Sequence, residues 1–158
     1  MGYSVKGHPE VIQTLNTVLA GELIAINQYF LHSRMCKDWG FEKLADLIWK
    51  ESIDEMKHAQ TLTDRILFLE GIPNLQKLGK LSIGENIEEI LKCDLALEFT
   101  NIPNVQQGIE LCYKHTDHAS RELLEHILVQ EEEHVDWLES QLNIIKSIGV
   151  ENYLSTQL

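Results

Sequence analysis

Four stretches of this chain carry apolar residues at helical spacing, and each apolar stripe has a glutamate near its centre. Around Glu22, Glu98 and Glu131, apolar residues lie at offsets of −7, −3, +4 and +7. These offsets put the glutamate and its apolar neighbours on one helix face. The stripe around Glu55 is less regular, although three apolar residues still place this glutamate inward: Ile48, Ala59 and Leu62. The pattern predicts four helices that direct four carboxylates into one core.

The four glutamates are also matched in height. Glu22 and Glu55 are 33 positions apart, and the midpoint falls next to a turn predicted at Gly40. Glu98 and Glu131 are separated by the same 33 positions. In an antiparallel hairpin, each glutamate then lies about 24 Å from the bend, at 1.5 Å per residue. Both members of the second pair follow those of the first by 76 positions, which indicates two pseudo-equivalent halves.

Two of these glutamates are followed three residues later by a histidine: His58 after Glu55, and His134 after Glu131. Residues three apart share a helix face, so each pair can reach one point. Four buried carboxylates cannot all stay ionised and unpaired. Either several are protonated within a hydrogen-bonded polar layer, or cations hold them. Six residues at matched heights favour cations, and oxygen ligands with two imidazoles suit iron or manganese.

Prolines and glycines mark the ends of the first two helices. Pro9 suits the first turn of a helix, where its missing N–H does no harm. The helical period continues from there to the turn at Gly40. A second helix is predicted from about 41 to 70, because Gly71 and Pro73 form a common stop signal.

The second half of the chain is predicted to repeat this hairpin. Residues 71–81 read as a long crossover loop, and Ser82 with Glu85 forms an S-x-x-E capping box that opens a third helix. A break at 113–118 separates it from a fourth helix. A short fifth helix is expected over about 149–157, too short to be stable without packing on something.

The predicted fold class is all-α. No segment alternates with period two for long, and helices of this length favour a four-helix bundle over about 9–147, within one domain of residues 1–158. Pro103 falls inside the third helix, where it removes one backbone hydrogen bond. Because the apolar period resumes at Val105, we expect a kink or local bulge there and not a helix end.

Composition excludes several classes of partner. A net charge of −12 and a pI near 4.9 argue against nucleic acid and favour cations. No apolar run reaches the roughly 18–20 residues of a membrane span. The start of the chain has no apolar stretch typical of a signal peptide. The three cysteines have no C-x-x-C spacing, which indicates free thiols in a reducing cytoplasm.

Several longer motifs resemble one family, the bacterioferritins. The similar segments are GELIAINQYFLHSRM (21–35), ESIDEMKHA (51–59), RILFLEGIPNLQ (65–76) and ENYL (151–154). The likeness extends over about 7–157. Two lone glutamates with two Glu-x-x-His pairs are the ligand set of ferritin-like di-iron carboxylate proteins, and we take the assignment of iron from that likeness.

The resemblance implies both an activity and an assembly. It implies a ferroxidase that oxidises Fe(II) with O₂ or H₂O₂ and stores ferric mineral inside a shell of 24 subunits. Glu55 and Glu131 would bridge two irons, Glu22 and Glu98 would be terminal ligands, and each histidine would bind one iron. It further implies a reducing ferredoxin as the partner for iron release, and short C-terminal helices gathered about the four-fold axes of the shell.

The resemblance also implies haem b shared between two subunits, with Met56 of each on the haem iron. Met56 follows Glu55 directly and so points about 100° away from the metal face. A thioether suits haem iron, although a packing methionine at a dimer interface is the alternative. Tyr29 lies two turns from Glu22 on the same stripe. It would stand beside the iron site as a donor of an electron or hydrogen bond, or serve as an ordinary core tyrosine.

The chain departs from the family pattern at Lys50. Some bacterioferritins have a histidine at this position, which forms an iron site on the cavity wall with an aspartate like Asp54. A protonated lysine cannot bind iron, so an ion pair between Lys50 and Asp54 is expected instead.

Two other functions share parts of the sequence pattern. A di-iron oxidase acting on an organic substrate would have the same ligand set, and a metal-free helical interaction module would have the same helices.

Overall fold

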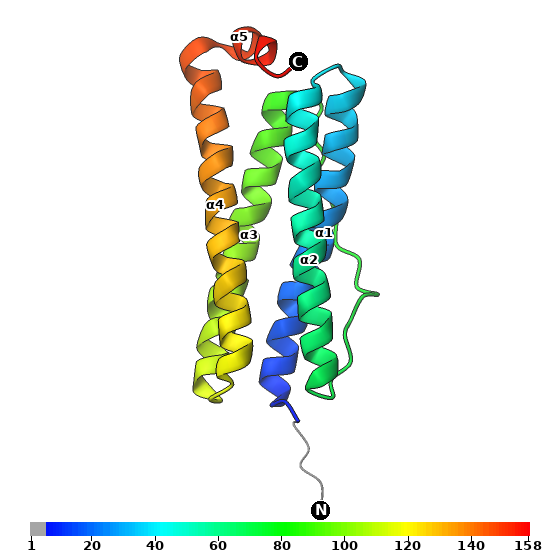
Figure 1. The fold of residues 1–158 in the computed structure, drawn as a ribbon, viewed down its shortest axis with the longest axis vertical. Helices are drawn as coiled ribbons and strands as arrows, with labels where there is room; N and C mark the ends of the chain where they lie inside the picture. Colours follow the sequence, from blue (N-terminus) through cyan, green and yellow to red (C-terminus); the bar gives the residue numbers. More distant parts are fainter. Residues whose placement is uncertain (1–5) are drawn as a thin grey trace, which may run out of the picture.

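The computed structural model describes residues 6–158, and the helices form an antiparallel bundle (Figure 1). The elements are α1 (Pro9–Asp38), α2 (Glu42–Phe68), α3 (Ile87–Lys114), α4 (His118–Ile148) and the short α5 (Val150–Ser155). The all-α prediction is confirmed, and the helix bounds fall close to those predicted. Helix α1 packs against α2, α3 packs against α4, and the two hairpins meet mainly through α1 and α3.

Most helices begin and end near the prolines and glycines predicted to mark their ends. Pro9 occupies the first turn of α1, and the His8 side chain caps that helix by accepting a hydrogen bond from the Glu10 N–H. Gly40 follows the end of α1 with φ of 91°, a conformation that glycine adopts without strain. Pro103 lies inside α3, which continues through it as expected. The predicted bend at this proline stays a prediction.

The predicted capping box at Ser82 is wrong, because α3 begins five residues later. Asn86 caps the helix, and its side-chain oxygen accepts a hydrogen bond from the Glu89 N–H. The Ser82 N–H instead donates to the Gln28 side chain at 3.0 Å, and the Gly84 N–H donates to His32 at 3.1 Å. These contacts with the buried side chains of Gln28 and His32 hold the end of the crossover loop extended, so the helix does not start there.

The predicted fifth helix is present and packs on its own bundle. Tyr153 is buried in a cluster with Cys36, Leu44 and Ile145. Its hydroxyl donates to the Gln141 side chain at 2.9 Å. The chain therefore supplies the surface that the isolated helix needs, and α5 covers one end of the bundle (Figure 1).

Replacing Tyr153 with alanine is expected to lower the free energy of unfolding by about 3–5 kcal/mol, because it empties a fully buried aromatic site. Tyr153→Phe keeps the ring and loses only the hydrogen bond to Gln141, so it should cost about 1 kcal/mol. Urea unfolding followed by circular dichroism gives both values. Equal effects of the two variants would show that ring packing is not what holds α5 on the bundle.

Candidate metal centre

The six residues predicted to converge do so halfway along the bundle. Glu22 comes from α1, Glu55 and His58 from α2, Glu98 from α3, and Glu131 and His134 from α4; all six are buried. One ligand atom from each of four residues lies within 4.8 Å of the others: Glu22, Glu55, His58 and Glu131. Glu55, Glu98 and His134 form a second such group. Glu55 belongs to both, so two adjacent metal positions could share it.

Close helix packing places these side chains at one height. Gly21 precedes Glu22, and a Cβ atom at Gly21 would lie 2.6 Å from the Asn101 side-chain oxygen. The Asn101 amide donates to the Gly21 carbonyl at 3.3 Å. The missing side chain at Gly21 therefore lets α1 and α3 approach each other beside Glu22 and Glu98.

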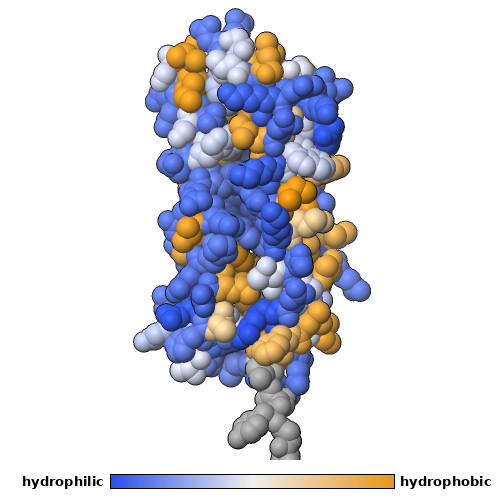
Figure 2. All heavy atoms as spheres, viewed as in Figure 1, coloured by the Kyte–Doolittle hydropathy of each residue, from blue (hydrophilic) through white to orange (hydrophobic). Residues whose placement is uncertain are grey.

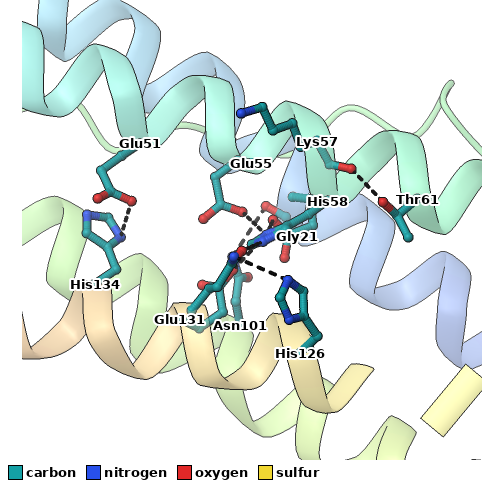
Figure 3. A network of polar contacts seen from close by, with 12 residues as sticks. Gly21, Glu51, Glu55, Lys57, His58, Thr61, Asn101, His126, Glu131 and His134 are labelled. Carbon is teal, nitrogen blue, oxygen red and sulfur yellow. Dashed lines mark hydrogen bonds and ion pairs between the residues drawn. The ribbon is translucent and has the colours of Figure 1, made fainter. Parts of the chain in front are cut away.

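His58 is surrounded by carboxylates. Its Nδ1 atom lies 3.2 Å from Glu55 Oε2, 3.4 Å from Glu22 Oε2 and 3.6 Å from Glu131 Oε1. Its Nε2 atom contacts the Gln130 side-chain oxygen. Figure 3 shows Glu55 and His58 reaching from α2 toward Glu131 on α4. This ring thus faces three carboxylates at once, which is the arrangement expected of a shared cation position.

His134 occupies the other side of the centre. Its Nδ1 atom lies 3.1 Å from Glu98 Oε1 and 3.8 Å from Glu51 Oε2, the contact drawn at one side of Figure 3. The Trp137 ring stacks on it, with centroids 6.1 Å apart. Because two carboxylates and an aromatic ring fix its orientation, His134 presents Nδ1 toward the centre.

Tyr29 lies directly beside this second group. Its hydroxyl donates a hydrogen bond to Glu98 Oε1, and its ring stands edge-on to His134 with centroids 5.1 Å apart. Burial raises the pKa of Tyr29, and the negative charge of Asp94 adds to the effect. The phenol therefore stays protonated and acts as a donor to a carboxylate of the centre.

Several carboxylate oxygens of the centre have no hydrogen-bond partner. These atoms are Glu22 Oε1, Glu98 Oε2 and both oxygens of Glu131. Within residues 6–158, the ion pairs of the four central glutamates are made with the two histidines alone. Unpaired buried carboxylate oxygens are costly unless a cation or proton compensates them. The residues present thus fit two divalent metal ions.

Burial and crowding shift the pKa values of two central residues. Burial raises the pKa of Glu55 to about 7. Burial alone would lower the pKa of His58, but the adjoining carboxylates of Glu131 and Glu55 outweigh it and raise the pKa to about 10. In the absence of metal, protons held by these two groups offset part of the negative charge, and a metal ion would displace them.

Two residues that contact the centre, Glu51 and Gln130, were not predicted from the sequence. Glu51 lies four residues before Glu55 on the same helix face, a spacing that could have identified it. Burial raises the pKa of the Glu51 carboxyl, which is 26% exposed. Gln130 directly precedes Glu131, and nothing in its spacing indicates the contact with His58.

A polar groove between α2 and α4 leads to the centre. It is lined by ten residues, among them Glu51, Asp54 and Glu133, and reaches Glu55, His58 and His134 at its floor. Figure 2 shows hydrophilic residues over this part of the surface. Helices α2 and α4 contact each other much less than the other neighbouring pairs, which leaves room for this opening. Its carboxylates suit the approach of a cation.

Known proteins are similar to this chain along nearly its whole length. Residues 12–148 match the ferritin-like domain. The chain is 46% identical over 149 residues to the bacterioferritin of Mycobacterium leprae, with 94% of each chain covered. Identity to bacterioferritin BfrA of Mycobacterium tuberculosis is 47%, also over 149 residues and 94% of each chain. This chain belongs to the bacterioferritin family. A bacterial ferritin of Synechocystis is 44% identical over 155 residues, which cover 98% of this chain and 99% of that protein.

Met56, the residue predicted to bind haem, lies on the outer face of α2. Its side chain is 57% exposed, so its sulfur is available to a ligand outside the chain. Trp49 and Ile53 precede it by seven and three residues, and Phe30 packs on Trp49 with ring centroids 5.6 Å apart. All four are exposed apolar residues. These four residues (Phe30, Trp49, Ile53, Met56) form an exposed apolar strip, a feature typical of surfaces that contact a partner.

The expected ion pair between Lys50 and Asp54 is wrong. Asp54 is paired with Lys57 instead, at 3.9 Å, and both side chains are substantially exposed. Surface pairs of this kind contribute little to stability and are easily exchanged.

Among the described residues, no helix combines the length and apolar character of a membrane span. All three cysteines are free, as predicted, with Cys36 and Cys112 buried.

In the metal-free protein, the raised pKa of Glu55 should make stability fall as pH rises. A carboxyl with a pKa of about 7 when folded and 4.5 otherwise stabilises the fold fully below pH 4.5, and loses this contribution as pH rises through 7. The contribution of His58 is complete below pH 6.5 and is lost progressively as pH rises from there through about 10. We expect the free energy of unfolding to fall by on the order of 2–3 kcal/mol between about pH 5 and 7, most of it from Glu55.

Urea unfolding at a series of pH values tests this expectation. Glu55→Gln keeps the size of the side chain and cannot ionise, so it should remove most of the decline. A glutamine variant with the pH slope of the unmodified protein would assign the decline to another group.

Proposed function

We propose that this protein stores iron and is a ferroxidase, with Fe(II) as the substrate bound by the six central residues. The observation that carries the proposal is the convergence of four buried glutamates, three of which have carboxylate oxygens without a hydrogen-bond partner. Family membership supports the iron-storage part. Iron suits a ligand set of carboxylates and imidazoles.

We propose a separate role for each of the six central residues. Glu55 and Glu131 bridge two Fe(II) ions, Glu22 and Glu98 are terminal ligands, and His58 and His134 each bind one iron. The presence of Glu55 in both ligand groups supports its bridging role. Protons held by Glu55 and His58 leave as the positive ions arrive. The buried surroundings keep the ligands in place and limit access of bulk water.

The electrons balance for either oxidant. Each Fe(II) loses one electron, so a pair supplies the two electrons that, with two protons from the solvent, reduce H₂O₂ to two water molecules. Two pairs supply the four electrons that O₂ needs. Tyr29, hydrogen-bonded to Glu98, would donate an electron or orient that carboxylate. Fe(III) then leaves for the mineral.

We also propose haem b bound between two subunits through Met56. One chain offers a single exposed thioether on the apolar strip, so Met56 of each of two copies would hold the haem between them. When bound, the haem would supply one-electron transfer. A reducing ferredoxin would then be the partner for iron release.

Storage requires a cavity, and we propose a cytoplasmic shell of 24 subunits. The net charge of −12 favours the attraction of Fe(II) to such a shell. Native mass measurement with an absorption spectrum reports shell size and haem together. A protein found only as a monomer at micromolar concentration and neutral pH would exclude storage.

Fe(II) titration of the metal-free protein under air tests the chemistry. We expect fast oxygen consumption that saturates at two irons per chain, followed by slower mineral growth. No iron-dependent oxygen consumption would leave only a helical interaction module. Oxidation without retained iron would favour the organic-substrate oxidase, although the carboxylate-lined groove suits cations better than an organic molecule.

A further inference from the structure

A second cluster of metal-binding side chains lies at the end of the bundle opposite α5. There the start of α1 meets the turn between α3 and α4 (Figure 1). His8 and Glu10 come from α1 and its cap, and His115 from the end of α3. One ligand atom from each lies within 4.8 Å of the others. His8 and Glu10 precede Glu22 by at least twelve positions, or about 18 Å along the helix, so the cluster is separate from the central site.

The positions of two donors already suit one ion. Glu10 Oε2 lies 3.2 Å from His115 Nε2. Two ligands on a tetrahedral zinc, with bonds of about 2.0–2.1 Å, are themselves about 3.4 Å apart. The hydrogen bond to His115 and the charge of Lys114 hold the pKa of Glu10 below its ordinary value, so the carboxylate is ionised.

The third donor needs a small movement. The His8 and His115 rings are stacked, with centroids 3.5 Å apart and planes 17° from parallel. Imidazole lone pairs lie in the ring plane, so parallel rings do not converge on one ion. His8 is exposed and can tilt toward Glu10. Its Nδ1 atom accepts the Glu10 N–H at 3.1 Å, and the tilt would exchange this capping bond for a metal bond.

We propose that His8, Glu10 and His115 form a surface site for a borderline divalent metal ion, of which Zn²⁺ is the representative. Two imidazoles and one carboxylate, with a water in the fourth position, form a common zinc ligand set. The ion would replace the Lys114 ammonium, which lies 3.7 Å from Glu10 Oε2. It would join the start of α1 to the end of α3. The site goes beyond the proposed function and does not depend on it.

The test is equilibrium binding of Zn²⁺ alone to the full-length, metal-free protein. Zinc also suits the central ligands, so the informative quantity is the difference between variants. His115→Gln should bind one zinc fewer per chain than the unmodified protein. His118→Gln, which removes an exposed histidine three residues away, is the matched control and should bind the same number. Glu10→Gln should weaken the same single site.

Two further measurements separate this site from the central one. The initial rate of Fe(II) oxidation should be the same in His115→Gln and the unmodified protein. Crystals soaked in zinc should give anomalous density between His8, Glu10 and His115, absent in His115→Gln. Equal zinc stoichiometry in the two proteins, or density at the central site alone, would overturn the proposal.

Discussion

Replacing Glu22 with alanine is expected to slow Fe(II) oxidation by more than about 100-fold while leaving the metal-free fold at least as stable. The variant lacks a proposed terminal ligand, and even residues that only support metal ligands change activity by about 10–100-fold. Glu22 Oε1 is buried without a partner, so its removal relieves an unfavourable group. Stopped-flow absorbance after Fe(II) addition measures the rate, and thermal unfolding measures the stability.

Glu98→Ala is the matched comparison, since Glu98 is the proposed equivalent ligand in the second hairpin. Its oxidation defect should be similar, but its metal-free form should be less stable by about 1–3 kcal/mol. Glu98 Oε1 accepts from the Tyr29 hydroxyl and lies 3.1 Å from His134, so its loss leaves buried polar groups unpaired. Oxidation at the unmodified rate in either variant would contradict the ligand assignment.

Replacing Met56 with leucine should abolish haem binding and change the initial rate of iron oxidation by less than about twofold. The thioether is the proposed ligand, and Met56 points about 100° away from the face that carries Glu55. The absorption spectrum after reconstitution with haem measures the first effect. Met56→His should bind haem with a shifted spectrum, because the axial ligand changes.

Met35→Leu is the control for this variant. Met35 packs against the buried cluster near α5, so its replacement should leave haem content unchanged. Haem binding by Met56→Leu with an unaltered spectrum would place the axial ligand elsewhere on the chain.

The convergence of the six central residues could be predicted because helix geometry is rigid. Spacings of three and 33 residues fix which side chains share a face and a height, and the structure brings all six together. The partner of Tyr29 could not be predicted in the same way. Tyr29 lies on the stripe of Glu22, yet its hydroxyl bonds Glu98, because the relative rotation of two helices depends on packing between them.

Two predictions from the sequence are wrong, the capping box at Ser82 and the ion pair between Lys50 and Asp54, and both failures have a physical reason. Ser82 has a good local capping sequence, but contacts from Gln28 and His32, more than 50 residues away, keep that segment extended. Lys50 and Lys57 are both within reach of Asp54 on one helix, and exposed side chains choose between such partners by small energies. Local patterns cannot resolve contacts made by distant residues or between near-equal alternatives.

The 76-position repeat relates ligands but not their surroundings, which makes the two halves of the centre chemically unequal. In the repeat, Val105 is the residue equivalent to Tyr29. Tyr29 donates a hydrogen bond to Glu98, but Val105 has no hydroxyl to donate to Glu22. Likewise Gln130, which contacts His58, corresponds to Asp54 on the groove wall. We expect one half-site to bind a metal ion more strongly than the other. Stepwise cobalt titration should resolve two affinities, whereas a single class of site would mean that the asymmetry has no energetic effect.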